Sequence, residues 1–319
     1  MEKRELGNSK LFVSRLGFGC LCMGYLQQNL SVQKGGELIM YAVDNGINFF
    51  DTAQFYKTYE HIAYAVKNGY NDLIICTKSY AYSKQQAEQA FNEAIRMSGK
   101  EIIDIFLLHE TESIDTIKGH YEALEFYIKM KEKGYIKAVG VSTHCISAVK
   151  SSALINDIDV IEAIININGI GIVDGTAEEM CHALEFAAEM GKGVIAMKPL
   201  GGGNLFRNPA KCFEYLIKNV AIDSILCGMV SKEEIEANVS FFNGDRQSDI
   251  LFENLTKVEK CLLIENWCTG CGDCVKKCSN GALSIKDSVA ICDEKKCLTC
   301  GYCSAACKEM ALKLISIKN

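Results

Sequence analysis

Short apolar runs alternate with longer amphipathic segments through residues 1–240. Eight of the runs have the length and composition of strands, and the segments between them, such as ELIMYAVDNG (37–46), space their apolar residues as a helix does. Strands that alternate with amphipathic helices predict βαβ units around a parallel sheet. The expected strands are 16–24, 47–53, 72–78, 104–109, 136–143, 159–168, 193–200 and 224–230.

Eight such units in about 230 residues predict an α/β fold, the (β/α)8 or TIM barrel. An open, doubly wound sheet is the alternative, but the first strand-to-helix turn, GFGCLCMG (17–24), lacks the G-x-G-x-x-G phosphate loop. We expect the barrel to span residues 1–242, a linker to span 243–260 and a second, small α+β domain to span 261–319.

Composition and charge exclude several classes of protein. The chain has 319 residues, of which 49% are hydrophobic and 23% charged, and a net charge of -6, which gives no basic surface for nucleic acid. It contains no run of about 18 uncharged apolar residues, and MEKRELGNSK (1–10) lacks the apolar centre of a secretory signal. We therefore expect a cytoplasmic protein that binds neither nucleic acid nor membrane.

The seventeen cysteines are unevenly distributed. From Cys268 the spacing is C-x2-C-x2-C-x3-C, and the same spacing returns from Cys297, 29 residues later. The offset also superimposes Ala282–Leu283 on Ala311–Leu312, which indicates a duplicated unit. Because the count is odd and the chain is large, we expect metal binding in a reducing compartment rather than disulfides.

Three thiolates at two-residue gaps suit one [4Fe-4S] cluster, and in the bacterial ferredoxin pattern the fourth thiolate comes from the other copy. Two zinc ribbons are the alternative, although zinc sites usually use pairs of C-x2-C knuckles. Cys292 falls outside the repeat. We predict two [4Fe-4S] clusters in a ferredoxin-like domain, one on Cys268, Cys271, Cys274 and Cys307 and the other on Cys278, Cys297, Cys300 and Cys303.

Polar residues stand at the ends of three successive expected strands, where barrel enzymes place their chemistry. Asp51 ends the second strand with Tyr56 five residues on, Lys78 ends the third, and His109 ends the fourth. An ammonium held by a carboxylate is expected to lower the pKa of the phenol, so that Tyr56 donates a proton while His109 orients a carbonyl. Taken singly, each residue has a structural explanation, such as a helix cap, a solvated strand end or a core histidine.

FDTAQFY (50–56), TK (77–78) and LLH (107–109), in this order, resemble the Asp, Tyr, Lys and His tetrad of the aldo-keto reductase superfamily. The likeness runs from residue 5 to about 240 and includes MKPLGGG (197–203). With the cysteine repeat, the whole chain is similar to members whose barrel carries a C-terminal ferredoxin-type domain. The resemblance implies a nicotinamide-dependent reduction of a carbonyl, or oxidation of an alcohol, by Asp51, Tyr56, Lys78 and His109.

The resemblance also implies a dinucleotide across the barrel mouth. The glycines at 201–203 would let backbone approach the pyrophosphate, and Ser231 with Glu234 would cap the helix at the adenosine end. Val230 stands where an arginine commonly meets the 2'-phosphate, and Glu162 and Met197 replace a usual glutamine and aromatic. These departures argue against NADP and leave NAD or a flavin. The implied nucleotide contacts are Ser142, Asn166, Lys198, Leu200, Gly201, Gly203, Gly228, Ser231, Lys232 and Asn238.

Nicotinamide transfers two electrons as a hydride, whereas each cluster passes one electron at a time. We expect an aldo-keto reductase-like oxidoreductase for a small carbonyl or alcohol, with the clusters used for electron transfer. The alternatives are clusters that are only structural, and a barrel that has lost catalysis and serves electron carriage or regulation. A third is a ferredoxin-coupled reductase, in which a ferredoxin or another redox protein feeds electrons through the clusters to a barrel-bound flavin or substrate.

Overall fold

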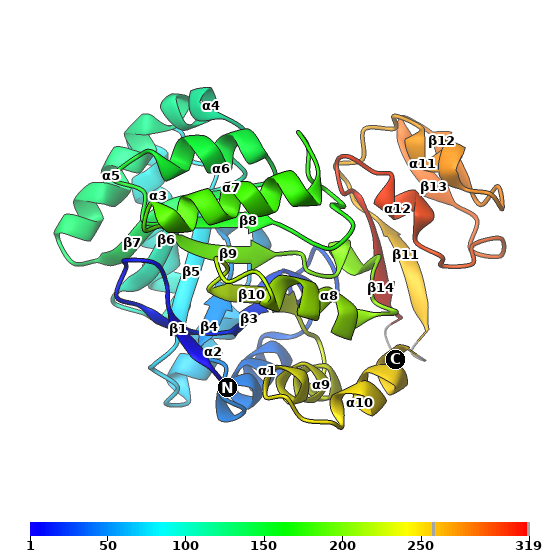
Figure 1. The fold of residues 1–319 in the computed structure, drawn as a ribbon, viewed down its shortest axis with the longest axis horizontal. Helices are drawn as coiled ribbons and strands as arrows, with labels where there is room; N and C mark the ends of the chain where they lie inside the picture. The colour runs from blue at the N-terminus through cyan, green and yellow to red at the C-terminus, as the bar shows by residue number, and fades with distance from the viewer. Residues whose placement is uncertain (257–258, 318–319) are drawn as a thin grey trace.

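The computed structural model describes residues 1–256 and 259–317, and within these ranges the eight apolar runs close into a parallel barrel inside a ring of helices (Figure 1). The strands follow one another around the barrel in the order β10-β3-β4-β5-β6-β7-β8-β9. Each expected run overlaps one of them, with β5 ending one residue after its run and β6 beginning one residue before its run, so the predicted barrel is confirmed. They are β3 (Leu16–Gly19), β4 (Phe49–Asp51), β5 (Ile74–Ser79), β6 (Ile103–Leu108), β7 (Ile136–Thr143), β8 (Val160–Ile164), β9 (Gly193–Met197) and β10 (Ser224–Gly228).

Amphipathic helices cover the outside of the barrel, because each buries one apolar face against the strands. Polar caps fix where several of them begin: Ser83 accepts a hydrogen bond from the backbone N–H of Gln86, and Thr176 forms a capping box with Glu179. The helices are α1 (Val32–Asp44), α2 (Tyr59–Lys67), α3 (Lys84–Ser98), α4 (Ile114–Gly119), α5 (Tyr121–Glu132), α6 (Ile146–Ala153), α7 (Ala177–Glu189), α8 (Pro209–Ile217) and α9 (Lys232–Phe242), with 3-10 turns η1 (Cys20–Met23), η2 (Gln54–Tyr56) and η3 (Gly201–Gly203).

A hairpin that the apolar pattern did not predict precedes the barrel. Its strands β1 (Lys3–Glu5) and β2 (Phe12–Ser14) pair antiparallel, and the turn between them packs on Gly193, the first residue of β9. The buried guanidinium of Arg15 donates to the carbonyls of Ile217 and Ile222, which precede β10. The hairpin therefore covers the amino-terminal end of the barrel and leaves the carboxyl ends of the strands for other contacts.

The segment expected to be a linker, 243–260, contains the helix α10 (Ser248–Thr256). Phe252 on this helix is buried, and its ring lies 6.2 Å from that of Phe213 and 5.8 Å from that of Phe241. The helix α10 is thus packed onto α8 and α9 through Phe252, because burying this aromatic side chain is more favourable than leaving it in water. Residues 257 and 258 of the expected linker lie outside the described residues.

The chain after residue 259 folds into a small α+β unit made of two similar halves. β11 (Lys260–Ile264) pairs antiparallel with β14 (Leu312–Ser316), and β12 (Leu283–Lys286) pairs with β13 (Val289–Cys292). The short helices α11 (Asp273–Lys277) and α12 (Tyr302–Ala305) each follow a glycine, Gly272 or Gly301, at φ 83°. Corresponding elements lie 29 residues apart, as the cysteine spacing predicts. Residues 318 and 319 of the expected second domain lie outside the described residues.

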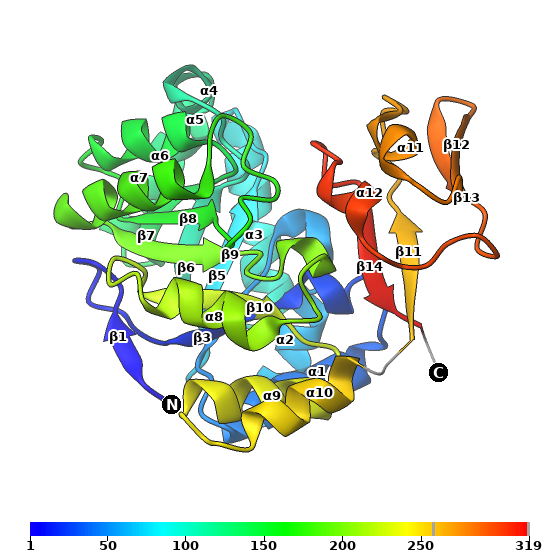
Figure 2. The ribbon, with the colours of Figure 1, turned by 45° about the vertical axis from the view of Figure 1, so that its right-hand side comes forward.

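The small unit packs on the mouth of the barrel through β14, which lies on the side of β11 nearer the barrel (Figures 1 and 2). A Cβ atom added to Gly203 would lie 2.4 Å from the carbonyl oxygen of Leu314, and one added to Gly202 would lie 3.1 Å from Cε of Met310. The backbone of η3 can therefore approach β14 only because it carries no side chains there. The contact joins the barrel to the C-terminal unit.

None of the helices in the described ranges combines the length and the apolar character that crossing a membrane requires.

This contact predicts the outcome of adding one methyl group. Gly203→Ala should destabilise the protein more than Gly69→Ala, although both glycines have nearly the same positive φ, 92° and 95°. The left-handed backbone costs each alanine about 1 kcal/mol, but only at position 203 does the new methyl group meet another part of the chain. Thermal unfolding measures the loss of stability in each variant. Hydrogen exchange should show faster opening of β14 in Gly203→Ala but not in Gly69→Ala. Equal losses and unchanged exchange would contradict the contact.

Candidate active site

Lys78 lies at the centre of the predicted tetrad. Its ammonium is fully buried and contacts Oδ1 of Asp51, Oε2 of Glu162 at 3.1 Å and the carbonyl of Thr52 at 3.1 Å. Burial lowers the pKa of Lys78, but the carboxylates of Asp51 and Glu162 raise it more, so its pKa lies well above the ordinary value. Lys78 is a permanently charged group at the carboxyl end of β5.

Tyr56 lies beside this ammonium, as the strand-end positions predicted. Nζ of Lys78 is 5.5 Å from the centre of the phenol ring. Burial nevertheless raises the pKa of Tyr56 well above its ordinary value, and the charge of Lys78 offsets only part of that effect. The charge of Lys78 lowers this pKa, as expected, but removing the phenolate from water raises it by more, so the net shift is upward.

His109 packs against Tyr56 with its ring edge-on, 5.6 Å between centres, and stacks on Tyr80 at 4.3 Å. Burial lowers its pKa well below the ordinary value, and the Lys78 charge lowers it further, so the imidazole is neutral. Its Nδ1 is buried with no hydrogen-bond partner among the described residues. The hydroxyl of Tyr80 donates to Glu110 at 2.6 Å, which holds the stacked ring over the histidine.

Glu162 also belongs to the site, although the sequence indicated only that it replaces a usual glutamine. It lies in β8, is 1% exposed and lines the same cavity as Tyr56 and Asp51. Burial raises its pKa to about 8, with the nearby Asp51 acting in the same direction and Lys78 against it. Burial and Asp51 thus favour the protonated carboxyl, which can donate a hydrogen bond, while the Lys78 ammonium favours the ionised one. A single acid inside the apolar strand VIEAI (160–164) was the available signal.

A cavity with an empty volume of about 1190 Å³, including its open mouth, lies over the carboxyl ends of the strands. Barrel residues form its floor, and the C-terminal unit forms part of its wall. The pattern of apolar residues at 312–316 predicts a strand, but it does not specify which surface that strand packs on. The contribution of these residues to the cavity wall could therefore not be predicted from the sequence. The wall residues from the C-terminal unit are Lys260, Met310, Lys313, Leu314 and Ile315.

The residues expected to contact a nucleotide divide into two groups. Lys198, Leu200, Gly203 and Gly228 line the cavity, and Gly201 lies beside them in η3. The other five do not line it and have contacts within the protein. Ser142 accepts from the N–H of Glu110, Asn166 exchanges hydrogen bonds with the backbone of Ile170, Ser231 caps α9, Lys232 lies over the ring of Tyr41, and Asn238 donates to Cys227.

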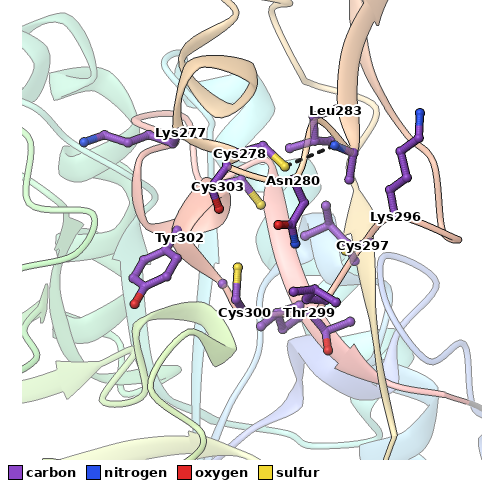
Figure 3. A pocket seen from close by; sticks show the side chains of 16 residues that line it. Lys277, Cys278, Asn280, Leu283, Lys296, Cys297, Thr299, Cys300, Tyr302 and Cys303 are labelled. Carbon is purple, nitrogen blue, oxygen red and sulfur yellow. Dashed lines mark hydrogen bonds between the residues drawn. The ribbon is translucent and has the colours of Figure 1, made fainter.

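Two smaller cavities in the C-terminal unit are each lined by four of the predicted ligand cysteines. Cys268, Cys271, Cys274 and Cys307 line one, and Cys278, Cys297, Cys300 and Cys303 line the other (Figure 3). In each set the fourth thiol comes from the other half of the repeat, as expected. Backbone N–H groups point at two of the sulfurs, Ala282 to Cys278 at 3.3 Å and Ala290 to Cys268 at 3.4 Å. Leu314 lines both the second of these cavities and the barrel-mouth cavity.

Comparisons with known proteins agree with the barrel. The family model described as "Aldo/keto reductase family" matches residues 15–213. An uncharacterized oxidoreductase of Bacillus subtilis (strain 168) is 24% identical over 78% of this chain and 94% of its own. L-galactose dehydrogenase of Arabidopsis thaliana is 24% identical over 82% of this chain and 94% of its own. One component of an ion-translocating oxidoreductase complex from Methanosarcina acetivorans is 40% identical over 47 residues, 15% of this chain and 18% of that protein.

Solved structures show the same fold. A putative aldo-keto reductase from Pseudomonas aeruginosa superimposes with a TM-score of 0.65 at 21% identity, over 76% of this chain and 95% of that one. The holo form of an aldo-keto reductase from Bacillus halodurans gives a TM-score of 0.64 at 22% identity, over 80% and 96%. Since the family model matches more than half of the sequence, the chain belongs to the aldo/keto reductase family and is an NAD(P)-dependent oxidoreductase.

Proposed function

We propose that the chain interconverts a carbonyl and an alcohol in the barrel-mouth cavity, with Tyr56 as general acid and base. The contact that supports this most directly is Tyr56 beside the buried ammonium of Lys78, which Asp51 and Glu162 hold in place. Tyr56 gives its proton to the carbonyl oxygen as the adjacent carbon is reduced, and the positive charge of Lys78 stabilises the phenolate that remains. The neutral imidazole of His109 packs on the phenol and orients it.

The cavity suits a nicotinamide dinucleotide, because it extends from Tyr56 past Gly203 to Gly228 at the end of β10. When bound, the nicotinamide supplies hydride to the substrate carbon. The carboxylate of Glu234 accepts from the N–H of Val230 at 2.7 Å and lines the cavity, so it repels an added phosphate at this end. Lys232 points to Tyr41 instead. We therefore propose NAD rather than NADP as the cofactor.

The proton on Glu162 completes the charge balance of the site. When Glu162 holds a proton, one carboxylate faces one ammonium, Asp51 against Lys78, and the buried cluster carries no net charge; when it is ionised, it adds to the attraction that keeps Lys78 charged. A buried ion pair with further hydrogen bonds is far less costly than a buried group of net charge. The arrangement allows Lys78 to keep its proton in the apolar barrel, and thus to stabilise the phenolate of Tyr56.

We further propose that the two cysteine-lined cavities bind [4Fe-4S] clusters. Three thiols at two-residue gaps, with a fourth from the other half of the repeat, suit a four-iron cluster, whereas zinc sites usually use pairs of C-x2-C knuckles. A cluster supplies one electron at a time. Leu314 lines both the second set and the barrel-mouth cavity, so the two sites are neighbours. Because NAD transfers hydride, one-electron exchange between them would need a bound flavin or a substrate that forms a radical.

Tyr56→Phe should lower kcat for carbonyl reduction with NADH by about 10²- to 10⁴-fold, since that is what a general acid contributes, with the KM changing little. Tyr121→Phe, which removes a hydroxyl from an exposed ring on α5, is the control and should keep full activity. Steady-state kinetics with aromatic and aliphatic aldehydes measure both variants. Wild-type rates in Tyr56→Phe would rule out the phenol as the acid.

Glu162→Gln should flatten the pH dependence of stability. The folded protein holds this proton up to about pH 8, whereas the unfolded chain loses it near the ordinary value of 4.5. The contribution of Glu162 to the free energy of unfolding is therefore at its maximum below pH 4.5. It falls as the pH rises to 8, by up to about 1.4 kcal/mol per pH unit. The Tm of the wild type should drop relative to Glu162→Gln between pH 5 and 8. Glu185→Gln, on the exposed face of α7, is the control, and parallel Tm curves for wild type and Glu162→Gln would contradict the raised pKa.

Anaerobically purified protein should contain about 8 iron and 8 sulfide per chain. Cys271 and Cys300 occupy the same place in the two halves and are both exposed. Cys271→Ala and Cys300→Ala should each lose one cluster, leaving about 4 iron and removing a different component of the electron paramagnetic resonance spectrum of the reduced protein. Cys181→Ser, in α7, should keep all the iron. Zinc in place of iron, or the same spectral loss in both variants, would contradict the assignment.

A further inference from the structure

The wall of the barrel-mouth cavity carries a positive charge that the tetrad does not use. Lys198 follows β9 directly and lines the cavity together with Tyr56 and Glu162. Its Nζ lies 2.7 Å from Nε2 of His144. Burial, and after it the charge of Lys198, keeps the pKa of His144 well below its ordinary value. The imidazole is therefore neutral and accepts the hydrogen bond from Lys198. Among the described residues no carboxylate lies within 4.0 Å of this ammonium, in contrast to Lys78.

The backbone at Lys198 is held in a conformation that few residues adopt. Its φ of 57° lies in the left-handed region, which costs a residue with a side chain about 1 kcal/mol or more. Strain of this kind persists only where the surrounding structure holds the residue in place. The effect here is to bring a cation to the cavity beside His144, at the end of β7, rather than to solvent.

A second lysine reaches the same cavity from the C-terminal unit. Lys313 in β14 is 6% exposed, donates to Glu265 at 2.6 Å and lies 4.7 Å from the centre of the Trp267 ring. The Glu265 carboxylate neutralises it in part, while the indole fixes its direction. Burial lowers the pKa of Lys198 to about 8; the charges of Glu110 and Glu162 act against this effect, and those of Lys313 and Lys78 add to it. Lys198 and Lys313 both line the cavity and are close enough for their charges to interact.

We propose that the cavity binds a carbonyl substrate that carries an acidic group, with the acid held by Lys198 and attracted by Lys313 from the opposing wall. This inference rests on the proposed function at Tyr56. Lys198 has a neutral hydrogen-bond partner in His144 but no carboxylate within 4.0 Å among the described residues. An anionic group would supply that charge, and a charge-assisted hydrogen bond to it is about twice as strong as one between neutral groups. The substrate class is therefore an aldehyde or ketone acid rather than a neutral carbonyl. Lys198 is a binding residue in this assignment, and its ligand is the substrate acid instead of the nucleotide.

Matched pairs of substrates test the proposal: 4-carboxybenzaldehyde against its methyl ester, and succinic semialdehyde against its methyl ester, each reduced with NADH. The wild type should prefer the acid, and Lys198→Met should raise the KM for the acid about 10- to 100-fold, as expected for losing a hydrogen bond to a charged group. The KM for the ester should stay within about twofold. Lys198→Arg keeps the charge and should restore most of the preference. Lys211→Met, on the exposed surface of α8, is the control for removing a lysine.

The outcomes separate the proposals. Equal KM values for acid and ester in the wild type would overturn the inference and leave the carbonyl chemistry standing. If Lys198→Met instead weakens NADH binding and affects acid and ester alike, the anion bound by Lys198 is the pyrophosphate of the cofactor, and the substrate assignment is wrong. If the wild type reduces neither substrate, the proposed function fails. In that case calorimetry with 4-carboxybenzyl alcohol tests the anion site independently of catalysis. Binding to the wild type that is lost in Lys198→Met would support the site, and any other result would contradict it.

Discussion

The buried ammonium of Lys78 constrains the rest of the site. A charge with no access to water is tolerated only where opposite charge and hydrogen bonds surround it, and here the partners come from β4 and β8 as well as from a backbone carbonyl. β4 is the neighbour of β5, but β8 lies three strands further around the barrel. The partners can meet Lys78 only when the barrel is closed. The chemistry at Tyr56 therefore depends on complete folding of the barrel, and not on a local motif.

The barrel and the tetrad could be predicted because both leave local signals. A strand buried on both faces requires an uninterrupted apolar run, and catalytic groups of a barrel follow the ends of those runs, as Asp51, Lys78 and His109 do. The protonation states could not be predicted. The pKa of Tyr56 depends on the balance between the ammonium of Lys78, 5.5 Å away, and the loss of water around the phenol. The sequence indicates the nearby lysine, but it does not indicate how deeply the phenol is buried.

The glycines of η3 show a second limit. Three consecutive glycines indicate that something must come close to the backbone, and by resemblance that was the pyrophosphate of a dinucleotide. In the structure the backbone of β14 comes close to Gly203. Gly203 therefore has a close neighbour, Leu314, that is distant in the chain and is set by tertiary packing, while its contact with a dinucleotide stays a prediction. The helix α10 was missed for a similar reason, because Phe252 gains its stability from rings on α8 and α9.

The place of β14 in the cavity wall has a consequence for how the protein is made. Synthesis proceeds from the amino terminus, so the eight strands of the barrel leave the ribosome long before residues 310–315 do. Until those residues arrive, the mouth of the barrel lacks Met310, Lys313, Leu314 and Ile315 and is open on that side. Tyr56 and Lys78 are thus translated well before β14, the last of the described elements, which supplies part of the wall of their cavity.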